Sequence, residues 1–109
     1  MGRVVEVNDG DFNLEVIGST IPVLVDFYAD WCGPCKIVAP TMETLSKEYA
    51  GKVKFVKVNV DNNPEVALKY DIMSIPTAML FENGTVKDSV IGAVTAVAYR
   101  QRIDHALSA

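Results

Sequence analysis

Cysteine, histidine and tryptophan are scarce in this chain. Its 109 residues include two cysteines, one histidine and one tryptophan. A structural zinc site usually takes four thiolate or imidazole ligands, and a single copy of this chain cannot supply that set. The cysteines, Cys32 and Cys35, stand two residues apart. A loop that short constrains the unfolded chain little, so the pair would be a poor structural disulfide.

Long apolar runs and an excess of positive charge are also missing. No apolar run reaches membrane-spanning length. Fourteen acidic residues outnumber ten basic ones, for a net charge of −4, which argues against nucleic acid and membrane partners because both attract basic surfaces. Residues 1–11 lack the pattern of a secretion signal. The expected compartment is therefore the reducing cytoplasm, where cysteine pairs are more often catalytic than structural.

The rest of the composition suits one compact domain. Half of the residues are hydrophobic and 22 % are charged, as in ordinary soluble proteins. A chain of 109 residues is long enough for one core and too short for two domains. We therefore expect a single domain over residues 1–109.

The spacing of apolar residues predicts alternating strands and helices. Strands are expected over 4–7, 23–29, 53–60, 78–82 and 85–91, and helices over 12–18, 33–49, 64–71 and 96–107. Asn83-Gly84 is a strong hairpin signal between the last two strands. Strands separated by helices run parallel. The order β-α-β-α-β-α-β-β-α thus predicts an α/β fold, with a mixed five-stranded sheet flanked by four helices.

Several local features of the helices can also be predicted. Asp9, Asn63 and Thr95 have the side chains of helix N-caps and precede the first, third and last helices. The last helix is expected to bury Val97, Ile103 and Leu107.

The segment Trp31-Cys32-Gly33-Pro34-Cys35 follows the second strand and begins the next helix. Cys-x-x-Cys near a βαβ pattern in an intracellular chain is typical of thiol–disulfide chemistry, and open α/β sheets place their sites at this edge. Cys32 is the predicted nucleophile, because a helix N-terminus lowers the pKa of a thiol. Cys35, one turn deeper and expected to be more buried, is the predicted resolving thiol.

The chain resembles the thioredoxin family over nearly its whole length. The motifs that carry the resemblance occur in the family's order and spacing: Val25-Asp26-Phe27, Trp31-Cys32-Gly33-Pro34-Cys35-Lys36, Pro40, Lys57, Asn59-Val60-Asp61, Ile75-Pro76-Thr77, Phe81-Glu82-Asn83-Gly84 and Gly92-Ala93. One departure is Tyr28, where the family often has a second tryptophan. Another is the apolar segment Ala96-Val97-Ala98-Tyr99, in a helix expected to lie away from the site.

The resemblance implies the thioredoxin fold and a protein-disulfide reductase. Such a protein would cycle between dithiol and disulfide, receive electrons from a flavoprotein reductase, need no bound cofactor and act as a monomer. It also implies a cis Pro76 packed on the disulfide and an Ile75 backbone that pairs with extended substrates. A flat apolar surface around Cys32, here called the collar, would comprise Trp31, Gly33, Pro34, Ile75, Gly92 and Ala93.

Some of these residues have structural alternatives. Trp31 could be a core aromatic, and Gly92 could simply end a strand. Asp26 interrupts an apolar strand, and burying a carboxylate without a partner is costly. It either reaches an edge or pairs with a lysine, or it takes the proton of Cys35 as the resemblance implies. Lys57 either tempers the charge of Asp26 or is an edge-strand charge.

Two other functions are compatible with the same motif. One is a disulfide oxidase or isomerase of the same fold. In the family, histidine beside the second cysteine accompanies oxidising proteins, and Pro34 in that place favours a reductase. The other is a binding module that uses the collar without redox turnover.

Overall fold

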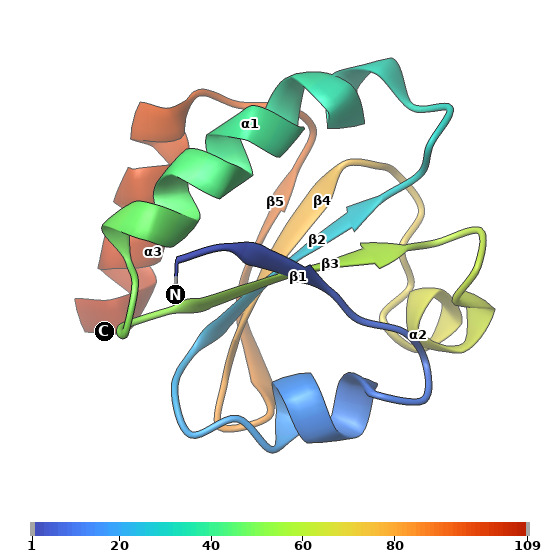
Figure 1. Cartoon of the computed structure of the whole chain (residues 1–109), viewed down its shortest axis with the longest axis horizontal. Coiled ribbons are helices and arrows are strands. Elements are labelled where there is room, and N and C mark those ends of the chain that lie inside the picture. Colours follow the sequence, from blue (N-terminus) through green and yellow to red (C-terminus); the bar gives the residue numbers. More distant parts are fainter. Residues whose placement is uncertain (1, 109) are drawn as a thin grey trace.

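The computed structural model describes residues 2–108 and contains a single five-stranded sheet with helices on both faces (Figure 1). The elements follow the predicted order: β1 (Val4–Glu6), η1 (Asn13–Ile17), β2 (Val23–Tyr28), α1 (Gly33–Glu48), β3 (Lys54–Asn59), α2 (Pro64–Lys69), β4 (Thr77–Glu82), β5 (Thr85–Ile91) and α3 (Ala96–Ser108). The first helix, η1, is a single π-helical turn, in which the Gly18 N–H donates to the Asn13 carbonyl at 2.8 Å. No helix among residues 2–108 has the length and apolarity needed to cross a membrane.

The strand order in the sheet is β1-β3-β2-β4-β5. β3 runs parallel to both β1 and β2, whereas β4 is antiparallel to β2 and β5. This confirms the predicted mixed sheet. β3 lies inside the sheet, so Lys57 is not an edge-strand charge.

Each face of the sheet has its own hydrophobic core. Alternate residues of β2 divide between the cores: Leu24 packs with α1 and α3, while Val25 and Phe27 pack with η1 and α2. Figure 1 shows α1 and α3 on one side of the sheet and η1 and α2 on the other. The whole of β2 is therefore flanked by protein. Asp26, on the same face as Leu24, points toward the α1 side.

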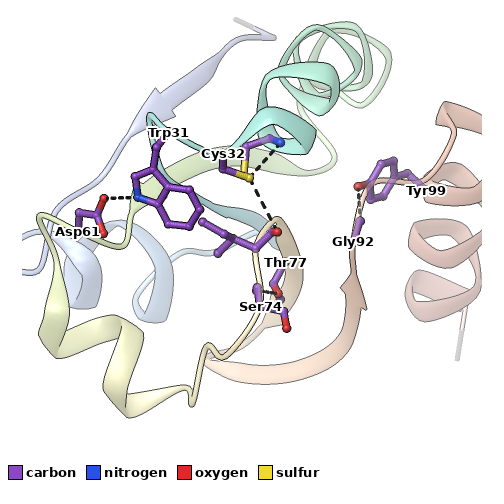
Figure 2. Close-up of a disulfide and its surroundings, with 9 residues drawn as sticks. Trp31, Cys32, Asp61, Ser74, Thr77, Gly92 and Tyr99 are labelled. Carbon is purple, nitrogen blue, oxygen red and sulfur yellow. Dashed lines mark hydrogen bonds between the residues drawn. A yellow bond between two sulfur atoms is a disulfide. The ribbon is translucent and has the colours of Figure 1, made fainter.

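The buried stripe of α3 differs from the prediction. Tyr99, Ile103 and Ala106 are buried, whereas Val97 is 58 % exposed. The buried residues are four and three positions apart and share one face, while Val97 lies two positions before Tyr99 and on the far side. The Tyr99 hydroxyl donates to the Gly92 carbonyl at 3.3 Å (Figure 2), so α3 is linked to the collar rather than remote from it.

The capping predictions were right for α3 and wrong for η1 and for α2. The Thr95 hydroxyl accepts from the Ala98 N–H at 3.2 Å, at the start of α3. The Asp9 carboxylate instead accepts from Glu65 and Val66 N–H groups, at 3.2 and 3.0 Å, and so caps the distant helix α2. Asn63 precedes α2 but its side chain does not cap it; its Oδ1 accepts from the Asp9 N–H at 2.7 Å. Two loops far apart in sequence are thereby joined.

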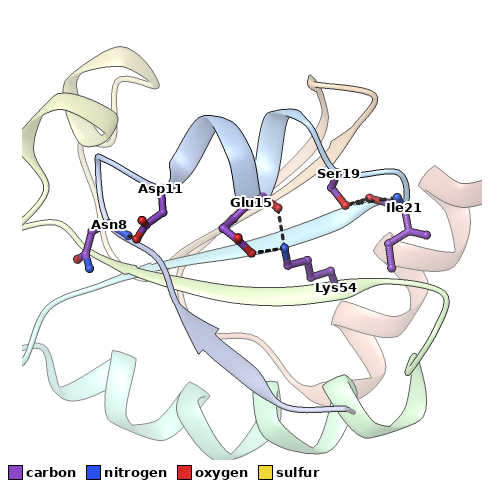
Figure 3. Close-up of polar contacts among 6 residues, drawn as sticks. All are labelled: Asn8, Asp11, Glu15, Ser19, Ile21 and Lys54. Atoms are coloured by element: carbon purple, nitrogen blue, oxygen red, sulfur yellow. Dashed lines mark hydrogen bonds and ion pairs between the residues drawn. The ribbon is translucent and has the colours of Figure 1, made fainter.

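η1 is fastened to the sheet by a lysine of β3 (Figure 3). Lys54 Nζ donates to the Glu15 carboxylate at 2.6 Å and to the Glu15 carbonyl at 2.9 Å. Beyond η1, the Ser19 hydroxyl donates to the Ile21 carbonyl at 2.8 Å and shapes the entry into β2. At the same end of the sheet, beside Ile17, Asn83 and Gly84 both have positive φ, 54° and 77°, as the predicted two-residue hairpin requires.

Candidate active site at the start of α1

Cys32 and Cys35 form a disulfide at the first turn of α1, with Cα atoms 5.3 Å apart. Cys32 is the N-cap residue, and the Cys35 N–H donates to Cys32 Sγ at 3.2 Å. Pro34 lies in the first turn, where its missing N–H leaves no helical bond unmade. Cys32 Sγ also lies 3.8 Å from the Ile75 carbonyl oxygen (Figure 2). The unpaired end of the helix thus faces the sulfur of Cys32.

Both cysteines are nearly inaccessible in the disulfide form. Each is 4 % exposed, so the predicted difference in burial is absent. The reason is that the bond holds the sulfurs together and both residues pack with Ala29 in one small cluster. The two sulfurs differ in surroundings instead: Cys32 accepts the helical N–H, whereas Cys35 lines a cavity beneath α1.

The residues predicted to form the collar are exposed to different degrees. Trp31 is 69 % exposed, which excludes a core aromatic. Gly33, Pro34 and Ala93 are exposed, while Ile75 and Gly92 are half-buried. The Ile75–Pro76 bond is cis, as the resemblance implied, and Pro76 is buried. Ile75 packs against the cysteine cluster, and the Gly92 N–H donates to the Pro76 carbonyl at 2.8 Å.

Three polar residues that support the collar were not assigned a role from the sequence. The Trp31 indole N–H donates to Asp61 Oδ2 at 2.8 Å (Figure 2). The Asp61 N–H in turn donates to Asn59 Oδ1 at 3.0 Å. The Thr77 hydroxyl donates to the Ser74 carbonyl at 2.6 Å and braces the turn at Pro76. The motif Asn59-Val60-Asp61 was a usable signal, because polar residues at the carboxyl end of a strand adjoin the site edge.

Asp26 is buried beside Lys57 and does not reach an edge of the sheet. It is 5 % exposed and directly paired with Lys57 on β3. Its Oδ1 has no hydrogen-bond partner among the described residues. Burial raises the pKa of this carboxyl from 3.8 to about 6, and the nearby Lys57 charge offsets part of that rise. A carboxyl with such a pKa can exchange a proton near neutral pH.

A cavity of about 170 Å³ connects this carboxyl with the second cysteine. Its lining comprises Asp26, Tyr28, Ala29, Asp30, Cys35, Lys36, Ala39 and Lys57. The lining includes the polar side chains of Asp26, Asp30 and Lys57, and the volume exceeds that of a single water, so water can connect Asp26 with Cys35. Among residues 2–108, no group of three or more histidine, cysteine or acidic side chains is placed to hold a metal ion.

The chemistry that this arrangement performs is thiol–disulfide exchange. Two thiols at one helical turn form and break a disulfide by exchange with an external disulfide, which transfers two electrons. The fold and the cysteine pair therefore define a thiol–disulfide oxidoreductase.

Comparison with known proteins specifies the family. The Thioredoxin family model matches residues 3–105. Thioredoxin 1 of Nostoc sp. is 48 % identical over 104 residues, covering 95 % of this chain and 97 % of its own. Thioredoxin of Synechocystis sp. is 51 % identical over 94 residues, covering 86 % and 88 %. The chloroplastic M-type thioredoxin of Pisum sativum is 51 % identical across 95 % of this chain, which spans only 60 % of the pea protein's length. The chain belongs to the thioredoxin family.

Proposed function

We propose that the protein reduces disulfides in other proteins, with Cys32 as nucleophile and Cys35 as resolving thiol. The observation that carries this assignment is the hydrogen bond from the Cys35 N–H to Cys32 Sγ. In the dithiol form, the same N–H and the positive end of α1 favour a thiolate on Cys32. Cys32 is thus the sulfur that attacks an incoming disulfide.

The reaction proceeds in two exchanges that balance in electrons. The Cys32 thiolate attacks one sulfur of the substrate disulfide, forms a mixed disulfide and releases the other substrate sulfur as a thiolate. Cys35 then loses its proton and attacks Cys32 Sγ. The Cys32–Cys35 disulfide forms, and the second substrate sulfur leaves as a thiolate. The substrate gains the two electrons that the protein's thiols lose.

Asp26 is the proposed acceptor of the Cys35 proton. Asp26 and Cys35 line the same cavity, so the proton can move between them directly or through water. The raised pKa of Asp26 makes it a stronger base than an ordinary carboxylate. Lys57 is proposed to limit that rise and keep a fraction of the carboxyl ionised.

The collar and Pro76 are the proposed docking surface for the substrate. Trp31 and the exposed Pro34 supply apolar area beside Cys32. The Ile75 carbonyl, 3.8 Å from Cys32 Sγ, is the proposed partner for the backbone of an extended substrate segment. Gly92 and Ala93 complete the surface on the β5 side.

The proposed partners follow from the need to restore the dithiol. Family membership supports a reductase partner in general, and we infer that a flavoprotein reductase performs this step and that the protein acts as a monomer without bound cofactor. We place its action in a reducing compartment, the cytoplasm, because oxidising surroundings would keep the pair as a disulfide. The relatives from Pisum sativum and Spinacia oleracea are named as chloroplastic.

Insulin reduction with dithiothreitol as electron source tests the activity. The protein should accelerate precipitation of the freed insulin chains, and Cys32→Ser with Cys35→Ser should abolish the acceleration. Replacing dithiothreitol by NADPH and a bacterial flavoprotein thioredoxin reductase tests the partner separately. Light scattering after gel filtration tests the monomer. If the protein is active with dithiothreitol but is not reduced by the flavoprotein, the proposed partner is wrong and the proposed reductase activity still holds.

A further inference from the structure

Lys57 lies between two acidic residues in the sheet. It is directly paired with Asp26 of β2 on one side and with Glu6 of β1 on the other. Directly paired residues project from the same face of a sheet. The Lys57 side chain therefore has a buried carboxylate and an exposed one as neighbours.

The Lys57 ammonium is placed over an aromatic ring instead of against either carboxylate. Nζ lies 5.6 Å from the centre of the Tyr28 ring, within the range of a cation–π contact. The ion pairs within 4.0 Å among residues 2–108 do not include Lys57. Asp26 Oδ1 correspondingly has no hydrogen-bond partner in that part of the chain.

Tyr28 is itself fixed in place. Its hydroxyl donates to Glu6 Oε2 at 2.7 Å. Burial and the bond to Glu6 raise the pKa of the Tyr28 hydroxyl, so it remains a donor across the physiological range. Tyr28 and Lys57 both line the cavity that holds Asp26 and Cys35. The tryptophan that the family often carries at this position has no hydroxyl with which to form this bond.

We propose that Tyr28, fixed by Glu6, is a positioning residue that holds the Lys57 ammonium over its ring and away from Asp26. The Asp26 carboxylate is then left unpaired and available for the Cys35 proton, a consequence that rests on the proposed function of Asp26. Without the ring, the ammonium would move toward Asp26, favour its ionised form and make it a weaker base.

Other ionisable groups face Asp26 and stay unchanged in the test below. Asp30, Lys36 and Glu43 line the two cavities that border this carboxyl, and Tyr99 reaches it from α3. Cys35 also lines one of the cavities, but in the disulfide form it does not titrate.

The decisive measurement is the titration of Asp26 in the disulfide form, followed by NMR of its carboxyl carbon. Tyr28→Leu should lower the midpoint by about half a pH unit, the equivalent of one exposed cation–π contact. Tyr28→Phe keeps the ring and releases it from Glu6, so a smaller decrease is expected. Water admitted to Asp26 by the loss of the ring is an alternative cause of a lower midpoint, and it would act without Lys57.

The Lys57→Met background separates these two causes. If the ring acts through Lys57, Tyr28→Leu should leave the midpoint unchanged in Lys57→Met. The same decrease in both backgrounds would overturn the proposal, as would no decrease in the parent protein. Tyr28→Phe provides the same comparison if the leucine variant does not fold.

A kinetic measurement tests the consequence for the reaction. Resolution of a mixed disulfide between Cys32 and thionitrobenzoate can be followed by absorbance across a pH series. Tyr28→Leu should move the acid limb of the rate–pH profile to lower pH. It should also reduce the rate of resolution on the alkaline plateau by up to about threefold, since half a pH unit is a factor of about three. If Asp26→Asn leaves resolution unchanged, the proton-acceptor role fails, while the titration still decides where Tyr28 holds Lys57.

Discussion

The Cys35 N–H donates a hydrogen bond to Cys32 Sγ at 3.2 Å. Cys32 is the N-cap residue of α1, so its sulfur occupies the place that a capping oxygen takes in other helices. A thiolate accepts such a bond better than a thiol does. The helix thus distinguishes two cysteines that are equally buried in the disulfide form.

This hydrogen bond predicts selective alkylation of the reduced protein. Brief treatment with iodoacetamide near neutral pH should modify Cys32 well before Cys35, because the Cys35 N–H and the helix N-terminus favour a thiolate at Cys32. Mass spectrometry of the digested protein measures the two rates. Faster labelling of Cys35 would reverse the assignment of nucleophile and resolving thiol.

Replacement of the resolving thiol should trap substrates. With Cys35→Ser, the first exchange still occurs at Cys32, but the second cannot, so mixed disulfides accumulate. Non-reducing gels of a disulfide-containing extract should show captured proteins that dithiothreitol releases. The double variant Cys32→Ser, Cys35→Ser is the control. Equal capture by both variants would favour a binding module over a reductase.

Asp26 should make the protein less stable above neutral pH than below it. Its pKa rises from 3.8 to about 6 on folding, so the native state binds the proton more tightly. The contribution is favourable below about pH 4, falls as the pH rises to about 6 and then levels off. This rise corresponds to about 3 kcal/mol of unfolding free energy lost at high pH.

Asp26→Leu tests that relationship. It should raise the unfolding free energy near pH 8 by roughly 1–4 kcal/mol after packing losses, and the gain should shrink toward pH 4. Urea unfolding at both pH values measures it, and Asp26→Asn controls for side-chain shape. Insulin reduction by the leucine variant should be slower. Lower stability near pH 8 with unchanged turnover would remove Asp26 from the proposed mechanism.

The Trp31–Asp61 hydrogen bond should matter for protein substrates. Asp61→Ala removes the acceptor at 2.8 Å from the indole nitrogen and frees an exposed collar side chain. Insulin kcat/KM should fall by roughly two- to tenfold, the equivalent of one hydrogen bond. Reduction of a small aromatic disulfide should change less, since it needs less of the collar. Asp61→Asn, which keeps an acceptor, is the matched control; equal losses on both substrates would contradict a docking role.

Asp9 should be the side chain that stabilises α2. Asp9→Ala removes two hydrogen bonds to the N–H groups of Glu65 and Val66 and should lower the unfolding free energy by about 1–2 kcal/mol. Asp11→Ala, two residues away and with one long bond of 3.4 Å to Asn8, is the control and should change it by less than about 0.5 kcal/mol. Equal effects of the two variants would argue against capping by Asp9.

The element order and the cysteine site could be predicted because local signals agree with the fold. Alternation in β3, the hairpin at Asn83-Gly84 and the helix start at Gly33, with Pro34 in the first turn, are each confirmed. The predicted burial of Val97 was wrong. An apolar residue near the start of a helix can lie on either face, and the sequence does not show which face packs on the sheet. The roles proposed for Asp26, Lys57 and the collar remain predictions.

What the sequence could not reveal are contacts between residues distant along the chain. Asp9 matches the local pattern of an N-cap for η1. Its carboxylate oxygens instead accept hydrogen bonds from N–H groups of α2, more than fifty residues away. The bond from Tyr99 to Gly92 depends on how α3 packs on the sheet. The placement of Lys57 over Tyr28 depends on strand order, because β1 must lie beside β3 for Glu6 to reach Tyr28.

The contrast between two neighbouring residues affects which disulfides can react. Cys32 is 4 % exposed, whereas Trp31 beside it is 69 % exposed. If Cys32 is the attacking sulfur, as proposed, its small exposed area is best reached by a disulfide that projects from its own protein. Selectivity therefore begins with the shape of the partner, before side-chain identity contributes. Disulfides on protruding or locally unfolded loops would be reduced first, and those in flat or concave surfaces would be spared.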